Sequence, residues 1–372
     1  MGRPKAVAAT SVVSYMVLLH RRSWTQRHET MGFRRVQEIP SPGEIREMVP
    51  LSGELQRIKA ERDREIRAVF EGKSDRLLLV IGPCSADNAD AVCEYVGRLA
   101  RLQEVVRERL LIVPRIYTNK PRTTGEGYKG MSHQPDPQKA PNLVEGLKAI
   151  RQMQIRALQE SHLTAADEML YPDNTPYMED VLSYHAVGAR SVENQQHRLT
   201  ASGLVVPVGM KNPTGGDLGV MFNAIFAAQR PHVFSYKGWE VSTTGNPFAH
   251  AILRGAVDLS GRSLPNYHYE DLLHVAGMYL ERSLVNPTII VDTNHNNSAK
   301  QYNQQPRIAM EVMQSRQNSG TLREIVRGLM VESYLVEGSQ RPGENVYGKS
   351  ITDPCMGWET SETFVKELAD CA

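Results

Sequence analysis

The sequence of 372 residues predicts an α/β protein, a (β/α)8 TIM barrel with an N-terminal extension and an inserted β-hairpin. Three observations predict this class. From residue 75 onward, short apolar runs alternate with longer amphipathic segments, which is the pattern of parallel βαβ units. The short runs number eight, and eight such units close a barrel. No linker divides residues 75–358 into two domains, and no internal repeat is visible.

The predicted strands are short, mostly apolar runs bounded by polar or turn-forming residues. Runs of this length suit strands that are buried on both faces of a parallel sheet. In chain order they are residues 77–81, 111–116, 164–168, 187–190, 206–210, 251–254, 288–292 and 328–331.

The segments between the strands carry apolar residues at three- and four-residue spacing, as amphipathic helices do. In the first segment Val92, Val96, Leu99 and Val106 share one helical face. The predicted barrel helices are residues 88–107, 143–161, 217–228, 269–282 and 306–319. Residues 232–245 interrupt the alternation with two short strand-like runs around a Gly-Trp turn, so we expect an inserted hairpin there.

The first thirty residues differ from the rest of the chain. They are basic, with Glu29 as their one acid, around an apolar run. This composition resembles a targeting segment, although a disordered extension before Met31 also explains it. Residues 31–74 follow as a charged arm, in which the spacing predicts a helix over 54–70, and residues 75–372 form the predicted barrel domain.

The overall composition excludes several classes of protein. The 43 Lys and Arg residues nearly balance the 42 Asp and Glu residues, so nothing in the net charge favours binding to nucleic acid or to an anionic membrane. No apolar stretch reaches the roughly 18–20 residues that cross a bilayer. Four cysteines in a chain of this length indicate a reducing compartment rather than a disulfide framework. We therefore expect a cytoplasmic enzyme or binding protein.

Chemically capable residues follow the predicted strands at the point where each strand ends. In a parallel barrel these carboxyl ends form the catalytic face. The residues at or just past the eight strands are Cys84, Arg115, Glu168, Arg190, Lys211, Arg254, His295 and Glu332. The sequence therefore predicts a functional site at this mouth of the barrel.

One group of the predicted mouth residues is cationic. It consists of Arg115, Lys120, Arg122, Arg190, Lys211 and Arg254. A cation buried after a strand is costly unless an anion meets it, and the Arg fork suits phosphate and carboxylate oxygens. The group predicts a polyanionic ligand, and the Pro-stiffened run of residues 120–124 suggests a second phosphate.

A second group joins Cys84 with His295, Glu332 and Asp353. A thiolate, an imidazole and two carboxylates suit a divalent ion such as Mn, Fe, Co or Zn. Two other interpretations stay open at this point. The residues could be structural, with the carboxylates neutralising arginines, or Cys84 and His295 could form a nucleophilic dyad whose thiol pKa the surrounding cations lower.

Taken together, the motifs resemble the class I 3-deoxy-D-arabino-heptulosonate 7-phosphate (DAHP) synthases, also called phospho-2-dehydro-3-deoxyheptonate aldolases. The matching stretches run in the family's order over most of the chain. They are residues 81–85 (IGPCS), 120–124 (KPRTT), 188–191 (GARS), 208–212 (VGMKN), 252–255 (ILRG), 330–333 (MVES) and 348–353 (GKSITD).

The resemblance implies a transferase that condenses phosphoenolpyruvate with erythrose 4-phosphate in the first step of the shikimate pathway, for aromatic amino acid or aromatic secondary-metabolite biosynthesis. It implies a bound divalent metal and assigns a role to each motif residue, with Lys120, Glu168 and His295 as the catalytic residues. The implied metal ligands are Cys84, His295, Glu332 and Asp353. The implied phosphoenolpyruvate residues are Arg115, Lys120, Glu168, Arg190, Lys211 and Arg254. The implied erythrose 4-phosphate residues are Lys120, Pro121, Arg122 and Thr123.

The resemblance also implies partners for the N-terminal arm. In this family the arm carries subunit contacts and part of a feedback site, which leads us to expect a homodimer or homotetramer and allows an aromatic amino acid effector. Two alternatives stay open. The chain could use another aldose phosphate such as arabinose 5-phosphate, or it could be a catalytically idle regulatory paralogue. We expect no nucleic-acid or membrane partner.

Overall fold

The computed structural model describes residues 32–122, 124–136, 138–341 and 343–372, so the predicted extension of residues 1–30 lies outside the described residues. The chain divides into two units, Met1–Pro40 and Ser41–Ala372. In the first unit, residues 32–40 adopt neither helix nor strand. The second unit holds all the described helices and strands. The predicted division into residues 1–30, 31–74 and 75–372 stays a prediction.

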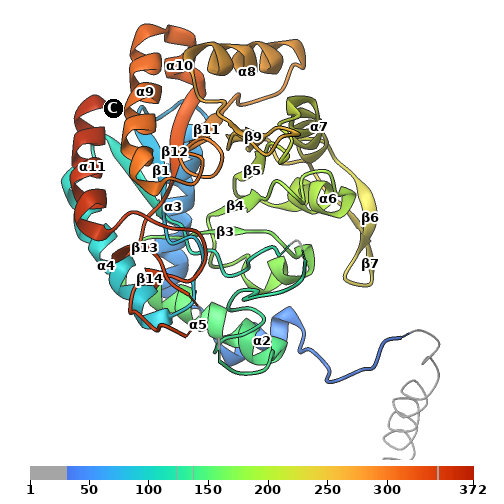
Figure 1. The fold of residues 1–372 in the computed structure, drawn as a ribbon. Coiled ribbons are helices and arrows are strands. Elements are labelled where there is room, and N and C mark those ends of the chain that lie inside the picture. Colours follow the sequence, from blue (N-terminus) through green and yellow to red (C-terminus); the bar gives the residue numbers. More distant parts are fainter. Residues whose placement is uncertain (1–31, 123, 137, 342) are drawn as a thin grey trace, which may run out of the picture. The chain divides into compact units, whose positions relative to one another are not determined.

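Eight parallel strands form the barrel (Figure 1). They are β1 (Leu77–Gly82), β2 (Leu110–Pro114), β3 (Ala166–Glu168), β4 (Tyr184–Val187), β5 (Val208–Lys211), β8 (Ala249–Leu253), β11 (Ile289–Asp292) and β12 (Val326–Glu332). Their order is β2-β1-β12-β11-β8-β5-β4-β3, and an Arg115–Ala166 bridge joins the two outer strands. The predicted fold class is confirmed.

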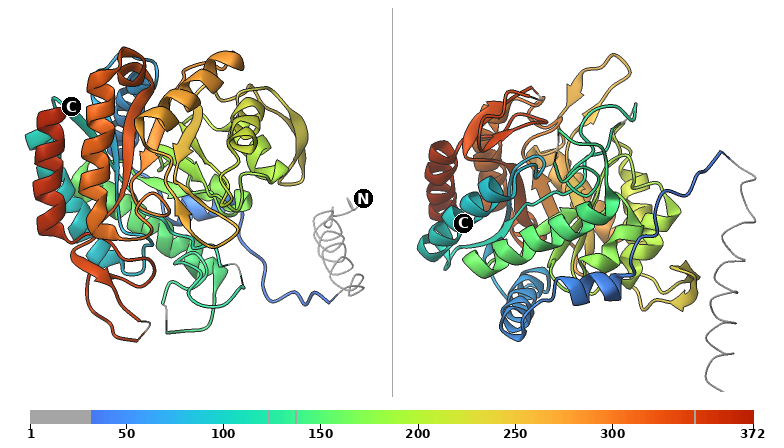
Figure 2. Two further views of the ribbon diagram at one scale, coloured as in Figure 1. Left: turned by 45° about the horizontal axis from the view of Figure 1, so that its top comes forward. Right: turned by 90° about the horizontal axis from the view of Figure 1, so that it is seen from below.

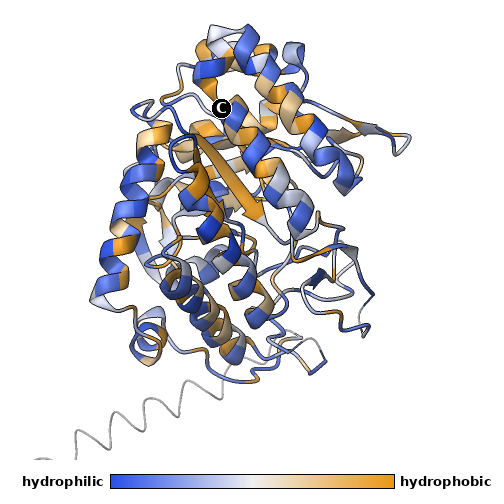
Figure 3. Cartoon of the chain, turned by 90° about the vertical axis from the view of Figure 1, so that its left-hand side faces the viewer, coloured by the Kyte–Doolittle hydropathy of each residue, from blue (hydrophilic) through white to orange (hydrophobic). Residues whose placement is uncertain are grey.

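Helices surround the strands, and their apolar stripes face inward (Figures 1 and 3). They are α4 (Ala89–Val106), α5 (Leu143–Ser161), α6 (Gln195–Gly203), α7 (Leu218–Ala228), α8 (Tyr269–Glu281), α9 (Gln305–Asn318), α10 (Gly320–Ile325) and α11 (Trp358–Cys371). Five of them begin at a side-chain cap, in which Asn88, Asn142, Asn194, Asp217 or Ser319 accepts a hydrogen bond from a backbone N–H of the first turn. The sequence analysis missed α6, whose polar composition leaves no apolar stripe.

Residues that alternate along the strands form two layers of packed side chains, one inside the barrel and one between the strands and the helices. Residues such as Leu78, Val80 and Ile252 fill the interior of the barrel, whereas Leu79 and Ile81 pack outward against the helices. A Cβ at Gly209 would lie 2.2 Å from the Cδ1 atom of Ile252, so only glycine fits there. The interior is a packed core and not a pore.

Helix α3 (Gly53–Phe70) covers the amino ends of the strands (Figure 2). Its last turn inserts Ile66, Val69 and Phe70 among the interior residues of the barrel. The Nη1 atom of Arg327, next to the start of β12, donates to the Val69 carbonyl at 2.9 Å. The shorter α2 (Pro42–Met48) precedes α3 and begins at a capping box between Ser41 and Glu44. The predicted helix over residues 54–70 is confirmed.

The predicted hairpin is present as β6 (Val233–Tyr236) and β7 (Trp239–Ser242). Two smaller strand pairs were not predicted, because their strands are short: β9 (Ala256–Val257) with β10 (Ser263–Leu264), and β13 (Val336–Ser339) with β14 (Lys349–Ser350). Short 3-10 helices occur at Pro172–Tyr177 and Tyr302–Gln304. Over the described residues, every helix is too short or too polar to span a bilayer.

One strand lies earlier than predicted. Strand β4 is Tyr184–Val187, whereas the sequence predicted residues 187–190. The prediction placed this strand too late because its first residues, Tyr184 and His185, do not form an apolar run. The strand ends before Gly188, where a Cβ would lie 2.3 Å from the Oε1 atom of Glu168. Arg190 is therefore a loop residue, and it is exposed.

Candidate active site

A cavity of about 320 Å³ opens at the carboxyl ends of the barrel strands. It contains the residues that the sequence singled out, with two exceptions. Glu332 is 1% exposed and lies behind the wall, and Thr123 lies outside the described residues. The predicted residues in the lining are Cys84, Arg115, Lys120, Pro121, Arg122, Glu168, Arg190, Lys211, Arg254, His295 and Asp353.

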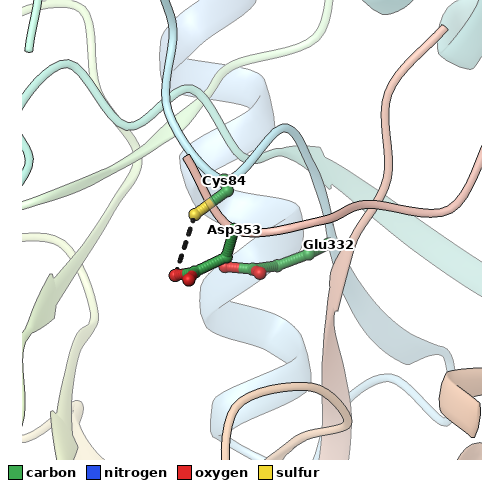
Figure 4. Close-up of side chains that lie close together, drawn as sticks. All are labelled: Cys84, Glu332 and Asp353. Atoms are coloured by element: carbon green, nitrogen blue, oxygen red, sulfur yellow. Dashed lines mark hydrogen bonds between the residues drawn. The ribbon is translucent and has the colours of Figure 1, made fainter. Parts of the chain in front are cut away.

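Three potential metal-ligating side chains converge at one side of this cavity (Figure 4). Donor atoms of Cys84, Glu332 and Asp353 all lie within 4.8 Å of one another, and the Cys84 sulfur is 3.5 Å from Asp353 Oδ2. Neighbouring strands explain part of this convergence, because Gly82 at the end of β1 pairs with Glu332 at the end of β12. Asp353 comes from the segment between β14 and α11.

His295 flanks this group from the loop after β11. Its Nε2 atom is 3.9 Å from Glu332 Oε1, and its Nδ1 atom is 2.8 Å from Asp292 Oδ2. The backbone of His295 is left-handed, with φ of 43°, which is uncommon for a residue with a side chain. The structure thus brings three of the four predicted ligands into one cluster and the fourth beside it.

Several cations in the wall already have anionic partners. The Arg115 guanidinium contacts Glu332 Oε1 at 3.0 Å, and it stacks on the Tyr117 ring with Cζ 3.6 Å from the centroid. The Lys120 ammonium lies 2.7 Å from the Cys84 sulfur and 3.0 Å from Asp353 Oδ2. Burial would lower the pKa of Lys120, but these two neighbours outweigh burial and raise it.

Arg254 differs from these cations because it is buried without a carboxylate partner among the described residues. It is 7% exposed, and its Nη1 atom has no hydrogen-bond partner there. Burial lowers the pKa of Arg254; the carboxylate of Asp292 acts in the opposite direction without compensating, and the charge of Arg190 lowers the pKa further. A buried guanidinium of this kind is stable only when an anion meets it. The cavity is therefore suited to an anionic ligand.

Glu168 also lines the cavity, and its carboxylate carries the opposite charge to these arginines. It ends β3, is 9% exposed, and its carboxylate packs against the bare Cα of Gly188. Arg122 lies on the loop after β2, where its Nε atom donates to the Tyr128 carbonyl at 2.8 Å.

The structure does not support a Cys84–His295 nucleophilic dyad. The side-chain contacts of the Cys84 sulfur among the described residues are with Lys120 and Asp353. Burial raises the pKa of the Cys84 thiol, Glu332 raises it further, and Lys120 does not compensate. The cations Lys120 and Arg115 do act to lower this pKa, as expected, but the desolvation of the fully buried thiol, which the expectation left out, outweighs them.

Three polar residues of the site were not predicted from the sequence. Asp292 contacts Lys211 Nζ at 3.1 Å as well as His295, and Asn294 donates to Glu332 Oε2 at 2.6 Å. Burial would raise the pKa of Asp292, but His295 and Lys211 outweigh burial and lower it. Lys300 is the third. All three lie close in sequence to His295, so reading a wider window after each strand would have found them.

Comparisons with known proteins agree with this geometry. The model of the DAHP synthetase I family matches residues 55–366. The Phe-sensitive phospho-2-dehydro-3-deoxyheptonate aldolase of Escherichia coli K12 is 37% identical over 354 residues, covering 92% of this chain and 97% of that protein. The Trp-sensitive enzyme of the same strain is 34% identical over 351 residues, with 92% and 97% coverage. The solved phospho-2-dehydro-3-deoxyheptonate aldolase of Francisella tularensis SCHU S4 superposes with a TM-score of 0.84 at 30% identity, covering 91% of this chain and 98% of that one.

Proposed function

The chain belongs to the DAHP synthetase I family, and on that premise we propose that it condenses phosphoenolpyruvate with erythrose 4-phosphate, using a bound divalent metal ion. It is an enzyme of the shikimate pathway, a DAHP synthase. The observation that carries the proposal is one cavity in which a buried, unpaired Arg254 faces the same space as the ligand cluster of Cys84 and Asp353.

The metal would be held by Cys84, Glu332 and Asp353, with His295 beside them. Their donor atoms lie close enough together to share one ion, and thiolate, imidazole and carboxylate together suit Mn, Fe, Co or Zn. When bound, such an ion supplies Lewis acidity toward the aldehyde oxygen of the sugar phosphate.

The cationic wall holds phosphoenolpyruvate. Arg190, Lys211 and Arg254 would bind its phosphate, and Arg115 with Lys211 its carboxylate. These fixed charges offset the repulsion between two anionic substrates that must meet face to face. Glu168, at the end of β3, would orient the water that adds to C2 of phosphoenolpyruvate before phosphate leaves.

Lys120 has a double role in this proposal. Its ammonium now donates a hydrogen bond to the Cys84 sulfur and forms an ion pair with Asp353. Once these two groups serve as ligands, the ammonium becomes free to donate a hydrogen bond to the aldehyde oxygen. Lys120, Pro121, Arg122 and Thr123 would hold erythrose 4-phosphate; the Arg122 Nε atom is engaged by Tyr128, which leaves the Nη groups for the sugar phosphate.

The experiment that tests the function follows phosphoenolpyruvate consumption and phosphate release with erythrose 4-phosphate, with and without a chelator. We expect turnover that the chelator abolishes and Mn²⁺ restores. Equal turnover with arabinose 5-phosphate would contradict the assigned sugar, and no turnover with either sugar would indicate a catalytically idle paralogue. The presence of every predicted metal and anion residue that the structure describes argues against an idle protein.

We further propose that an aromatic amino acid regulates the enzyme and that it works as a homodimer or homotetramer in the cytoplasm. The names of two relatives, one Phe-sensitive and one Trp-sensitive, support the regulation, whereas the assembly and the compartment follow from the family resemblance and the composition alone. Adding Phe, Tyr and Trp separately to the assay tests regulation, and light scattering tests the assembly.

A further inference from the structure

The loop after β11 joins a predicted metal ligand to a lysine that the proposed reaction does not use. Its residues include three with left-handed backbone and a side chain: His295 with φ of 43°, Ala299 with 51° and Lys300 with 62°. The Lys300 N–H donates to the His295 carbonyl at 2.7 Å. Such conformations persist only where the surroundings fix them, and they concentrate at functional sites.

Side-chain and backbone bonds fix this loop against the rest of the barrel. The Asn297 amide donates to the carbonyls of Leu253 at 3.1 Å and Asp292 at 2.8 Å. The Asn296 N–H donates to the Arg254 carbonyl at 3.1 Å. The loop is thereby tied to the ends of β8 and β11, so the backbone position of Lys300 is set by the same strands that carry the site.

From this position Lys300 reaches Asp353. Its Nζ atom lies 3.1 Å from Asp353 Oδ1, while Asp353 Oδ2 lies 3.0 Å from Lys120 and 3.5 Å from the Cys84 sulfur. The two oxygens therefore have different surroundings. Oδ2 faces the ligand cluster shown in Figure 4, and Oδ1 is held by Lys300.

We propose that Lys300 is a positioning residue, which holds Asp353 Oδ1 so that Oδ2 stays aimed at the metal ion. The inference rests on the proposed function, because it concerns the same metal site. Outer partners that orient a ligating carboxylate commonly change metal affinity by about 10- to 100-fold when they are removed. The competing explanation is an ordinary surface ion pair, since the Lys300 side chain is 56% exposed and such pairs usually contribute little.

The test is calorimetric titration of the metal-stripped full chain with Mn²⁺. Lys300→Met should weaken Mn²⁺ binding about tenfold, whereas Lys300→Arg, which keeps a donor and a charge, should bind within about threefold of wild type. The matched control is Lys366→Met, which removes a lysine of 50% exposure that lies 2.7 Å from Glu362 on α11. The control should leave Mn²⁺ binding unchanged, and the metal-free melting temperature of Lys300→Met should match wild type.

The sign of the effect decides between the explanations. Removing a positive charge near a dication would by itself tighten binding. Unchanged or tighter Mn²⁺ binding by Lys300→Met would therefore overturn the inference, as would a loss that Lys300→Arg shares. If the wild-type chain binds no Mn²⁺, the proposed metal site itself is wrong. If the wild-type chain binds Mn²⁺ and Lys300→Met binds it equally well, only the positioning role is wrong.

Discussion

The two ends of the barrel contain the same eight strands but differ in how their charges are satisfied. At the carboxyl end, the Nη1 atom of Arg254 is buried without a hydrogen-bond partner among the described residues, and His295 has a left-handed backbone. At the amino end, α3 places Phe70 and Ile66 in an apolar interior, and Arg327 caps the helix.

The difference teaches which end determines stability and which determines chemistry. Apolar burial at the amino end stabilises the fold. At the carboxyl end, the buried Arg254 guanidinium and the left-handed backbone of His295 destabilise the ligand-free protein, and the charge of Arg254 favours an anionic ligand. Substitutions at the two ends should therefore change different measurements, and they are ordered below from the largest expected effect to the smallest.

At the carboxyl end, Cys84→Ser should lower kcat/KM by about 10³-fold or more, because a hydroxyl replaces the thiolate ligand and the Lewis acidity is lost with the metal. Steady-state kinetics in Mn²⁺ buffer and calorimetric Mn²⁺ titration measure the two losses together. Near-full turnover of Cys84→Ser in chelated buffer would show that this sulfur is not a ligand.

At the amino end, Phe70→Ala should lower the free energy of unfolding by about 3–5 kcal/mol and leave kcat unchanged at low temperature. Phe70 is 1% exposed, and its ring lies 4.7 Å from His250 and 6.3 Å from Phe248 between centroids. Denaturant unfolding measures the effect, with the half-exposed Phe226→Ala as the control, for which we expect less than about 1 kcal/mol. A kcat that falls with Phe70→Ala would show that the two ends are coupled.

Two buried histidines near the amino end make stability depend on pH. Burial lowers the pKa of His250 to about 4 and, with Lys59 adding to the effect, that of His185 to about 4. Both pKa values lie below the unfolded value of about 6.5, so the unfolded chain binds more protons between these limits and stability falls as the pH drops from 6.5 to 4. Each histidine accounts for about 3 kcal/mol over the whole window.

Denaturant unfolding of wild type and His250→Gln at pH 6.5, 5.5 and 4.5 measures this loss. The neutral His250 ring is held between the Tyr184 hydroxyl at 2.7 Å and the Phe248 carbonyl at 2.8 Å. The variant should start from a lower stability and lose less of it on acidification. Parallel curves for the two proteins would mean that His250 does not titrate in this window.

The smallest expected effect is that of Arg254→Met, which tests the carboxyl end of the barrel. It should raise KM for phosphoenolpyruvate by about 10- to 100-fold, the loss expected for a charged hydrogen bond, with little change in KM for the sugar phosphate. Because the substitution removes a buried, unpaired cation, the ligand-free protein should unfold at the same or a slightly higher temperature. A clear loss of stability would show that Arg254 has a structural partner.

The sequence predicted the barrel because its strands and helices have local signals. Runs such as residues 77–81 read as buried strands without any knowledge of the fold. Strand β4 was displaced in the prediction because Tyr184 and His185 face neighbours that only the folded chain supplies. Phe70 and His250 lie far apart in the sequence, so no local sequence pattern predicts the contact between their rings.

The sequence indicated which residues lie at the candidate site, but it did not indicate which of them contact one another. Motif positions identified Cys84, Glu332 and Asp353, which the structure brings within reach of one another. The pairing of Lys120 with Cys84, and the role of Asp292 between Lys211 and His295, depend on side-chain directions across the mouth of the barrel. Such directions come from tertiary packing, which periodicity does not record.

The contact of Lys120 with Cys84 and Asp353 has a consequence for how the protein matures. Zinc fingers stay unfolded without their ion, because the binding of the ion supplies the free energy that folds them. Here a tethered ammonium already serves as a counter-ion for Asp353, so we expect a newly synthesised chain to complete its barrel without the proposed metal ion and to bind the ion afterwards.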